Sequence, residues 1–200
     1  MKKMTFRSIR ITLTLLVLLA FSGNVMAQSA NPAVLDITTG LLTWVKHLNN
    51  NVDKYFTREK GADLGQHLGT LKEDLRVYMK TRKTLSDSLF RHNIAPGKKD
   101  PDNLEALKTK MGAVMNSMRN VNDLVSNDLR AEGDKLNDEI YDALYGQEPR
   151  YLSNLEAFLG GVDVTKKDLA VDGSSNYQRL EECTAVIASL QEKIDRKMKK

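Results

Sequence analysis

The sequence predicts an all-α protein: an elongated antiparallel helical bundle or hairpin, with coiled-coil-like seams and a small helical appendage. Apolar residues recur at alternating steps of four and three over several long segments, which is the spacing of one helix face. Turn-forming residues separate these segments, and no segment shows the alternation typical of a strand. The chain has one cysteine, which excludes an intramolecular disulfide, so packing must stabilise the fold.

Residues 1–27 have the pattern of a secretory signal peptide. Basic residues at the start precede an apolar stretch from Ile11 to Phe21, and small residues precede a cleavage point after Ala27. The apolar stretch is shorter than the about 20 residues that a membrane span needs. We therefore expect an exported protein, periplasmic or secreted. Its mature chain, residues 28–200, would be a single helical-bundle domain without a stable membrane span.

Removal of the signal peptide changes the charge. The full chain has 30 Lys and Arg against 26 Asp and Glu, and residues 1–27 hold four of the basic residues and no acidic one. The mature chain would therefore carry 26 of each. A formal charge of zero does not favour nucleic acid binding, which depends on an excess of basic side chains. It also weighs against a strongly basic helical chaperone.

Cap and turn signals predict four long helices. Asparagine or aspartate before proline is typical of a helix start, and an acidic residue followed three positions later by glutamine resembles a capping box. Glycine and proline are expected to end helices. The predicted helices run from Asn31-Pro32 to about Thr57, from Asp63 with Gln66 to about Arg91, from Asp100-Pro101 to Tyr145, and from Ser175 to the basic C-terminal end.

The third predicted helix loses its rhythm in the middle. Val121, Val125 and Leu129 are spaced by four and four, and Gly133 follows closely. Such an irregularity locally unwinds a supercoil, and glycine permits a bend. We expect a bend near Gly133, and the spacing leaves open whether the helix continues unbroken to Tyr145.

Residues 147–173 are predicted to be an irregular connecting region. It would contain a short helix over 151–159, stopped by Gly160-Gly161, and one further turn capped by Thr165. The sequence Asp172-Gly173-Ser174-Ser175 predicts a turn before the last helix.

Arg82 is the irregular position in the seam of the second helix. The other seam residues are apolar: Leu64, Leu68, Leu71, Leu75, Tyr78, Leu85 and Leu89. A buried arginine without a partner would be too costly. The side chain either extends its guanidinium to solvent or pairs with a carboxylate of a facing helix. A partner-binding role for Arg82 is the third alternative.

No residue pattern predicts catalysis, a cofactor or a metal site. His47, His67 and His92 lie on separate segments, and Cys183 occupies a seam position between Leu180 and Ile187, typical of a buried core thiol. The carboxylates Asp134, Asp138, Glu139 and Asp142 have the spacing of a solvated helix face. The basic stripe Arg76–Thr84 has nearby acidic residues that can neutralise it.

Four aromatic residues surround the predicted elbow at 146–149: Tyr141, Tyr145, Tyr151 and Phe158. Tyrosines at the tip of a bundle can anchor a partner, because they bring large area with few rotatable bonds. The favoured alternative is that they pack the elbow. They are, with Arg82, the candidate partner-binding residues.

In this coarse architecture the chain resembles the exported helical-hairpin components of type IV secretion and conjugative transfer systems. Those proteins pair a signal peptide with long helices and a small helical appendage. The resemblance implies a minor pilus or assembly protein, and it transfers no functional residue. We therefore expect a non-enzymatic interaction or structural protein of the bacterial envelope, whose partners are other envelope proteins or copies of itself. The alternatives are a periplasmic ligand-binding bundle of four helices, as in sensing domains, and a helical chaperone.

Overall fold

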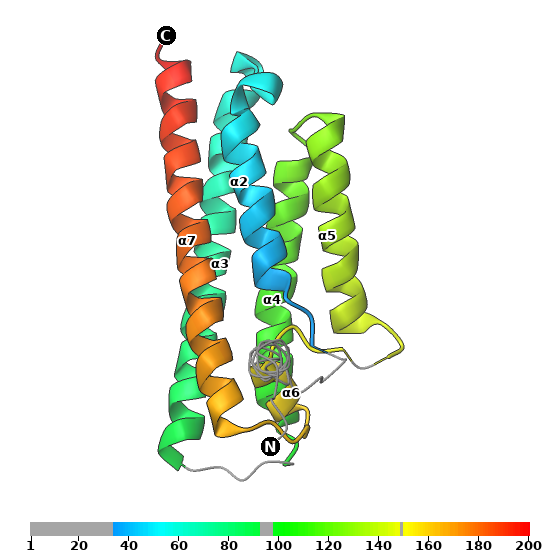
Figure 1. Ribbon diagram of the computed structural model, residues 1–200. Helices are drawn as coiled ribbons and strands as arrows, with labels where there is room; N and C mark the ends of the chain where they lie inside the picture. The colour runs from blue at the N-terminus through cyan, green and yellow to red at the C-terminus, as the bar shows by residue number, and fades with distance from the viewer. Residues whose placement is uncertain (1–33, 93–97, 149) are drawn as a thin grey trace, which may run out of the picture. The chain divides into compact units, whose positions relative to one another are not determined.

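The computed structural model describes residues 34–92, 98–148 and 150–200, so the predicted signal peptide lies outside the described residues. Residues 33–200 form one compact unit, and the prediction of an all-α helical bundle is confirmed (Figure 1). Its helices are α2 (Ile37–Tyr55), α3 (Arg58–His92), α4 (Pro101–Asn122), α5 (Asn127–Tyr145), α6 (Asn154–Leu159) and α7 (Lys166–Met198). In the described part of the chain, no helix is long and apolar enough to cross a membrane.

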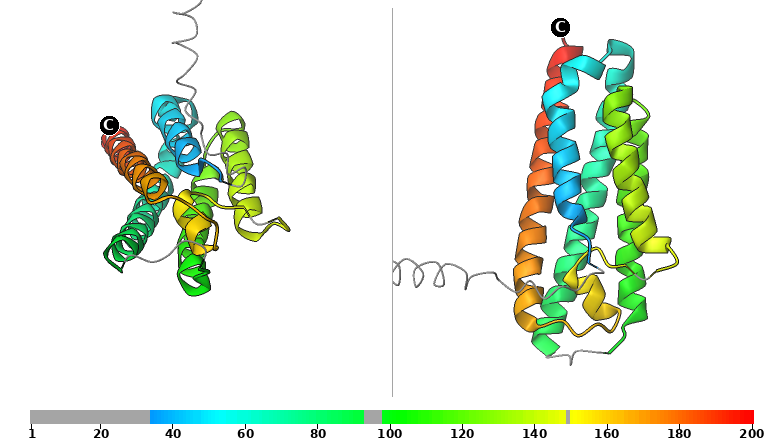
Figure 2. Two further views of the ribbon diagram at one scale, coloured as in Figure 1. Left: turned by 60° about the horizontal axis from the view of Figure 1, so that its bottom comes forward. Right: turned by 45° about the vertical axis from the view of Figure 1, so that its right-hand side comes forward.

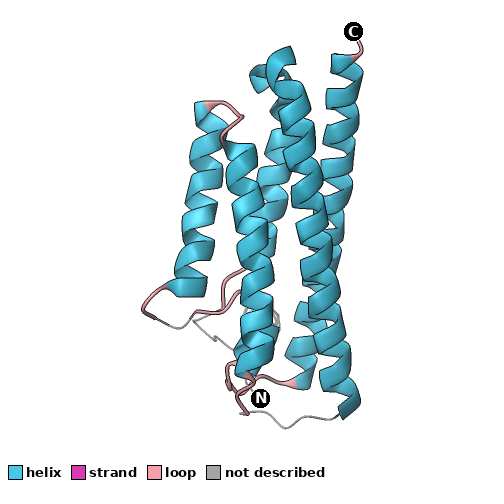
Figure 3. Ribbon diagram, turned by 180° about the vertical axis from the view of Figure 1, so that it is seen from behind, coloured by secondary structure: helices cyan, strands magenta, loops and turns pink. Residues whose placement is uncertain are grey.

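The long helices pack side by side, and each runs antiparallel to the next along the chain (Figures 1 and 2). Helix α3 packs against both α4 and α7, α2 covers α7, and α5 contacts α4 and α2. The short helix α6 packs on α4 and α7, at the end of the bundle where α3 ends and α7 begins. The described residues between the helices form loops and turns (Figure 3). An isolated bridge joins Val34 and Tyr151.

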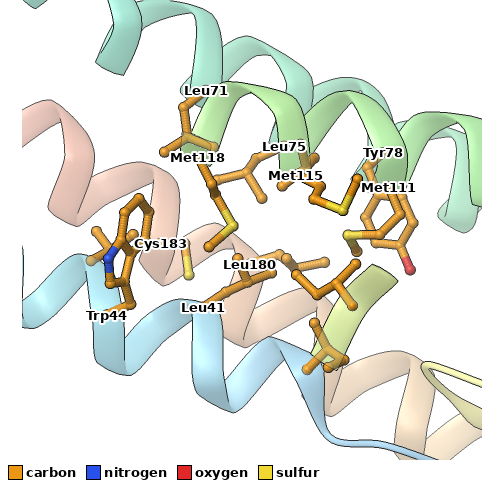
Figure 4. Close-up of a cluster of buried hydrophobic side chains, with 14 of the residues drawn as sticks. Leu41, Trp44, Leu71, Leu75, Tyr78, Met111, Met115, Met118, Leu180 and Cys183 are labelled. Carbon is orange, nitrogen blue, oxygen red and sulfur yellow. The ribbon is translucent and has the colours of Figure 1, made fainter. Parts of the chain in front are cut away.

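The predicted seams form the core. On α3, the seam residues from Leu64 to Tyr78 are buried, and Leu85 and Leu89 are half-buried. We call the central part of the core the apolar layer, and Figure 4 shows its side chains meeting between four helices. The layer comprises five fully buried residues from α2, α3, α4 and α7: Trp44, Leu71, Leu75, Met118 and Cys183.

The first two helices begin at other residues than predicted. Asn31 and Pro32 lie outside the described residues, and α2 has Asp36 as its N-cap, whose Oδ1 accepts a hydrogen bond from the backbone N of Thr39 at 3.2 Å. Helix α3 begins at Arg58 rather than Asp63, so the predicted capping box is wrong.

The earlier start of α3 has a local reason. Thr57 Oγ1 accepts a hydrogen bond from the backbone N of Lys60 at 3.4 Å, which satisfies a backbone donor at the helix start. Gly61 is buried in this first part of the helix, where a Cβ atom would collide with the side chain of Met198 and press on that of Phe56. The close approach of these two side chains packs the first turns of α3 into the bundle.

The third predicted helix, over 101–145, is two helices, and the chain reverses between them where only a bend was expected. Helix α4 ends at Asn122, residues 123–126 reverse the chain, and α5 starts at Asn127. The Asn122 side-chain Nδ2 donates to the backbone O of Arg130 at 3.0 Å and to Asp134 Oδ1 at 2.9 Å, while Arg130 Nη2 donates to the backbone O of Asp123 at 2.7 Å. These bonds replace helical ones at the reversal. Gly133 has no side chain, and the side chain of Asn122 occupies the space that a Cβ atom at this position would fill.

The region after α5 is less irregular than expected. The predicted short helix is α6, with Ser153 at its N-cap, and it ends at Gly160-Gly161, where Gly161 has a φ of 85°. Thr165 caps α7 as expected: its Oγ1 accepts from the backbone N of Asp168 at 3.1 Å. The helix then continues without a break to Met198, so the predicted turn over 172–175 and the predicted start at Ser175 are wrong. The reason is tertiary, because Asp172 and Asn176 on this stretch bind side chains of other helices.

Candidate functional site

Arg82 is buried in the bundle and paired. Its side chain is 6% exposed, and its Nη2 atom donates to Asp172 Oδ2 of α7 at 3.0 Å. Among the alternatives that the sequence predicts for Arg82, the structure shows the ion pair with a carboxylate of a facing helix. Burial by itself disfavours the charged form, but the neighbouring Tyr78, Glu156 and Asp172 outweigh it and raise the pKa of Arg82. The guanidinium is therefore a permanent positive charge inside the bundle.

Asp172 connects several helices. Its Oδ2 also accepts a hydrogen bond from the backbone N of Asn154 at the start of α6, at 3.1 Å. Its Oδ1 accepts from Asn176 Nδ2 at 2.5 Å, and Asn176 Oδ1 accepts from the Thr38 hydroxyl of α2 at 2.6 Å. One carboxylate thus joins α3, α6 and α7, and through Asn176 it reaches α2.

A second carboxyl group lies beside this pair. Glu156 of α6 is 2% exposed, and its Oε1 accepts a hydrogen bond from the Tyr78 hydroxyl at 2.7 Å. Its Oε2 is sealed from solvent and has no hydrogen-bond partner. Burial raises the pKa of Glu156 and favours its neutral form; burial also raises the pKa of the Tyr78 phenol. We call the group Thr38, Tyr78, Arg82, Glu156, Asp172 and Asn176 the polar layer.

A pocket of about 500 Å³ lies between α3, α6 and α7, in the size range of small-molecule sites. We call it the α3–α7 pocket. Arg82 forms part of its wall, so the buried cation of the polar layer reaches the pocket. Phe90 is 44% exposed and Tyr177 is 38% exposed. The lining residues used below are Met79, Arg82, Phe90, Leu155, Leu169 and Tyr177.

The four aromatic candidates do not form one surface. Tyr141 and Tyr145 are exposed neighbours on α5, with ring centroids 5.3 Å apart and ring planes inclined by 49°. Phe158 is buried, and Tyr151 is half-buried with its ring against Gly160. The backbone O of Tyr151 accepts from the backbone N of Leu35 at 2.7 Å. Tyr151 and Phe158 therefore pack the fold, whereas Tyr141 and Tyr145 face solvent.

The remaining chemical candidates are dispersed. Cys183 is a buried free thiol, as predicted, and burial raises its pKa to about 12. His47 lies on α2, where its Nδ1 is 2.8 Å from Glu132 Oε2 of α5, and His67 and His92 lie on α3. Within the ranges that the structure describes, no group of three or more His, Cys, Asp and Glu side chains could hold a metal ion.

The acidic residues of α5 face solvent, and two basic residues of the stripe Arg76–Thr84 have acidic partners nearby on α3. Asp134, Asp138, Glu139 and Asp142 are all exposed on α5, as a solvated face requires. In the stripe Arg76–Thr84, Arg76 Nη1 is 3.9 Å from Glu73 Oε2, and Lys83 Nζ is 2.7 Å from Asp87 Oδ2.

Sequence reasoning found Arg82 but missed Asp172 and Glu156. The residues around Asp172 predict a turn. Glu156 stands between Leu155 and Ala157 in a short segment, where no periodic pattern indicates that it is buried. One signal in the sequence indicates such partners. Tyr78 and Arg82 are four residues apart and share the buried face of their helix, so polar side chains are expected on the helices that pack against this face.

The chain matches no protein-family model, no curated protein and no solved structure.

Proposed function

We propose that the chain is an exported, non-enzymatic helical interaction protein of the bacterial envelope, and that it binds a protein partner through Tyr141 and Tyr145. The observation that carries the proposal is the adjacent pair of exposed tyrosine rings on α5. Tyrosine is enriched among the residues that dominate binding energy, because its ring buries much area and its hydroxyl can hydrogen-bond. The partner is another envelope protein or a second copy, consistent with the resemblance to components of type IV secretion and conjugative transfer.

The tyrosine pair is presented on a well-held support. Helix α5 packs on α4 and α2, and the Asn122 and Arg130 hydrogen bonds hold the reversal between α4 and α5. A Cβ atom on Gly112 of α4 would lie 3.2 Å from the Tyr145 hydroxyl, so the small residue leaves room for that side chain along α4. A surface that is already ordered loses less entropy on binding.

The double variant Tyr141→Ser/Tyr145→Ser tests this proposal. We expect it to fold like the wild type and to bind at least about tenfold more weakly, a loss that exposed aromatic anchors commonly carry. Partners captured from the envelope fraction would be identified by mass spectrometry and then titrated in purified form, and self-association would be measured by sedimentation. Val171→Ser, which removes an exposed apolar side chain of α7, is the control. Unchanged affinity for every identified partner and unchanged self-association would refute the proposal.

A second candidate function has its own observation: the α3–α7 pocket supports a ligand-binding helical bundle. Its volume suits a small molecule, and its lining combines apolar side chains with one buried cation. Native mass spectrometry of the protein purified from its own envelope checks this candidate. We expect a bound small molecule that is released on unfolding.

A further inference from the structure

The guanidinium of Arg82 has donors that the fold leaves unused. An arginine carries five N–H donors in a planar fork. Among the described residues, its only hydrogen bond runs from Nη2 to Asp172. In the described part of the chain, the Nε and Nη1 atoms have no hydrogen-bond partner, and they are not among the unpaired polar atoms sealed from solvent. Since Arg82 lines the α3–α7 pocket, these donors are available to a molecule inside it.

The rest of the lining is suited to an apolar body. Met79, Leu155 and Leu169 are buried residues whose side chains border the pocket. Phe90 and Tyr177 border it as well and stay partly exposed. A ligand that covered these five side chains would remove apolar surface from water, which is the main driving force for binding in such pockets.

The lining holds two basic residues, Arg82 and Lys83, and two acidic ones, Asp87 and Glu181. Glu181 is exposed, whereas Arg82 is buried, so the charge at the buried wall of the pocket favours an anionic head group. Both basic lining residues, Arg82 and Lys83, are consecutive on α3, and Lys83 already pairs with Asp87 at 2.7 Å. A cationic head group at the pocket wall would be repelled by Arg82. A carboxylate would accept charge-assisted hydrogen bonds, which are about twice as strong as neutral ones. A dianion would meet stronger repulsion from Asp172, which lies within electrostatic range of the same guanidinium.

This inference rests on the ligand-binding function proposed as the second candidate. We propose that the α3–α7 pocket binds an amphiphile with a single carboxylate, whose head group accepts hydrogen bonds from the free N–H groups of Arg82 and whose apolar body covers Met79, Leu169 and Tyr177. Arg82 then has two roles: one edge of its guanidinium holds Asp172 and the bundle, and the remaining edge receives the ligand. The partly exposed aromatic rings cover the apolar body.

Calorimetric titration of the purified protein with head-group-matched probes tests the proposal. The probes are decanoate, decanol, decyltrimethylammonium and decyl phosphate, each below the concentration at which it forms micelles. We expect decanoate to bind one to one and at least about tenfold more tightly than the other three, since a charge-assisted pair to an arginine gives about that factor.

A steric variant places the site without disturbing the polar layer. Gly173 lines the pocket, and an added Cβ atom would meet only Ser86 Oγ, at 3.9 Å. Gly173→Phe should therefore fold, fill the pocket and abolish decanoate binding. Gly65→Phe is the matched control, because Gly65 is also a helical glycine, on α3, with no atom within 4 Å of an added Cβ and outside the pocket lining. It should keep decanoate binding.

The possible results separate the inference from the function on which it rests. Equal binding of all four probes that Gly173→Phe abolishes would overturn the carboxylate assignment and leave a ligand-binding bundle. Tighter binding of decyl phosphate than of decanoate would also overturn the assignment. Binding that survives Gly173→Phe would place the site elsewhere and overturn the inference. Absence of binding by every probe would remove both the inference and the ligand-binding function.

Arg82→Met gives the direct measurement of the head-group contact. With the pocket open and the guanidinium removed, decanoate should bind no more tightly than decanol. A variant that keeps its helical circular dichroism and still prefers decanoate would refute the role of Arg82. Should Arg82→Met not fold, the probe series and Gly173→Phe decide the matter alone.

Discussion

The apolar layer and the polar layer occupy neighbouring positions in one bundle, and different forces hold them. In the apolar layer, Trp44, Met118 and Cys183 are fully buried among other apolar side chains. In the polar layer, Arg82 and Asp172 form a buried ion pair. Tyr78 belongs to the polar layer and also lies beside the apolar one, where Figure 4 shows its hydroxyl directed away from the apolar side chains.

The two layers differ in how well they tolerate substitutions and in how specifically their side chains select their partners. Apolar packing is non-directional, so side chains of similar volume can replace one another at a cost that is usually below about 1.5 kcal/mol. A buried ion pair and its hydrogen bonds require particular partners at particular distances, and breaking one partner is costly. The polar layer joins α6 and the first turns of α7 to α3. We infer that the apolar layer provides most of the stability, whereas the polar layer determines how this end of the bundle is arranged.

Among the variants considered, removal of the Asp172 carboxylate should lower the stability of the protein most. Asp172→Ala leaves the Arg82 guanidinium buried without its ion-pair partner and the Asn154 N–H without its acceptor. We expect the free energy of unfolding, measured by urea denaturation, to fall by about 3–5 kcal/mol. The double variant Arg82→Leu/Asp172→Leu should lose less, because it buries no unpaired charge. If Asp172→Ala were as stable as the wild type, the ion pair of Arg82 and Asp172 would not stabilise this end of the bundle.

The pH dependence of stability should depend on Glu156. Its folded-state pKa is raised by burial, so between the ordinary glutamate pKa of about 4.3 and the raised value the folded state keeps a proton that the unfolded state has lost. The free energy of unfolding therefore falls as pH rises through this interval, by at most about 1.4 kcal/mol per pH unit.

Glu156→Gln cannot titrate, and its amide oxygen can still accept from Tyr78. Its stability should fall less with rising pH than that of the wild type, so the difference grows in favour of the variant. Urea denaturation across this pH range gives the slopes. Glu105→Gln, at an exposed position of α4, is the control and should follow the wild type. Parallel curves for wild type and Glu156→Gln would contradict the assignment.

The smallest change in stability is expected for a substitution of Cys183 in the apolar layer. Cys183→Ala removes one buried atom and should lower the free energy of unfolding by on the order of 1 kcal/mol, because neighbouring side chains can partly fill the space. The thiol itself should react slowly with a maleimide in the folded protein, since burial raises its pKa to about 12. It should react quickly in urea, where a pKa of about 8.5 is expected. Equal labelling rates in the two states would show that the layer opens readily.

The sequence alone determined that the chain is helical and which faces of its helices are buried. The four-three spacing on α3 identified Leu64, Leu68 and Leu71 as core, because burial of one helix face is recorded in every turn of that helix. Asp100 and Pro101 marked the start of α4, and Gly146 the end of α5, because caps act within a few residues along the chain. The arginine in the seam also signalled a polar contact, since an unpaired charge could not stay buried.

The tertiary structure alone decided where the chain reverses, where α7 begins and which carboxylate holds Arg82. Residues 123–126 form a hairpin because Asn122 and Arg130 meet across it, and periodicity carries no record of such a contact. Asp172 and Gly173 read locally as a turn, yet they lie inside α7 because Asp172 pairs with a residue 90 positions earlier. Periodicity tells which face of a helix is covered but not what covers it. Partner identity depends on side chains that meet only after the helices have packed, and so the candidate pocket became visible only in the folded chain.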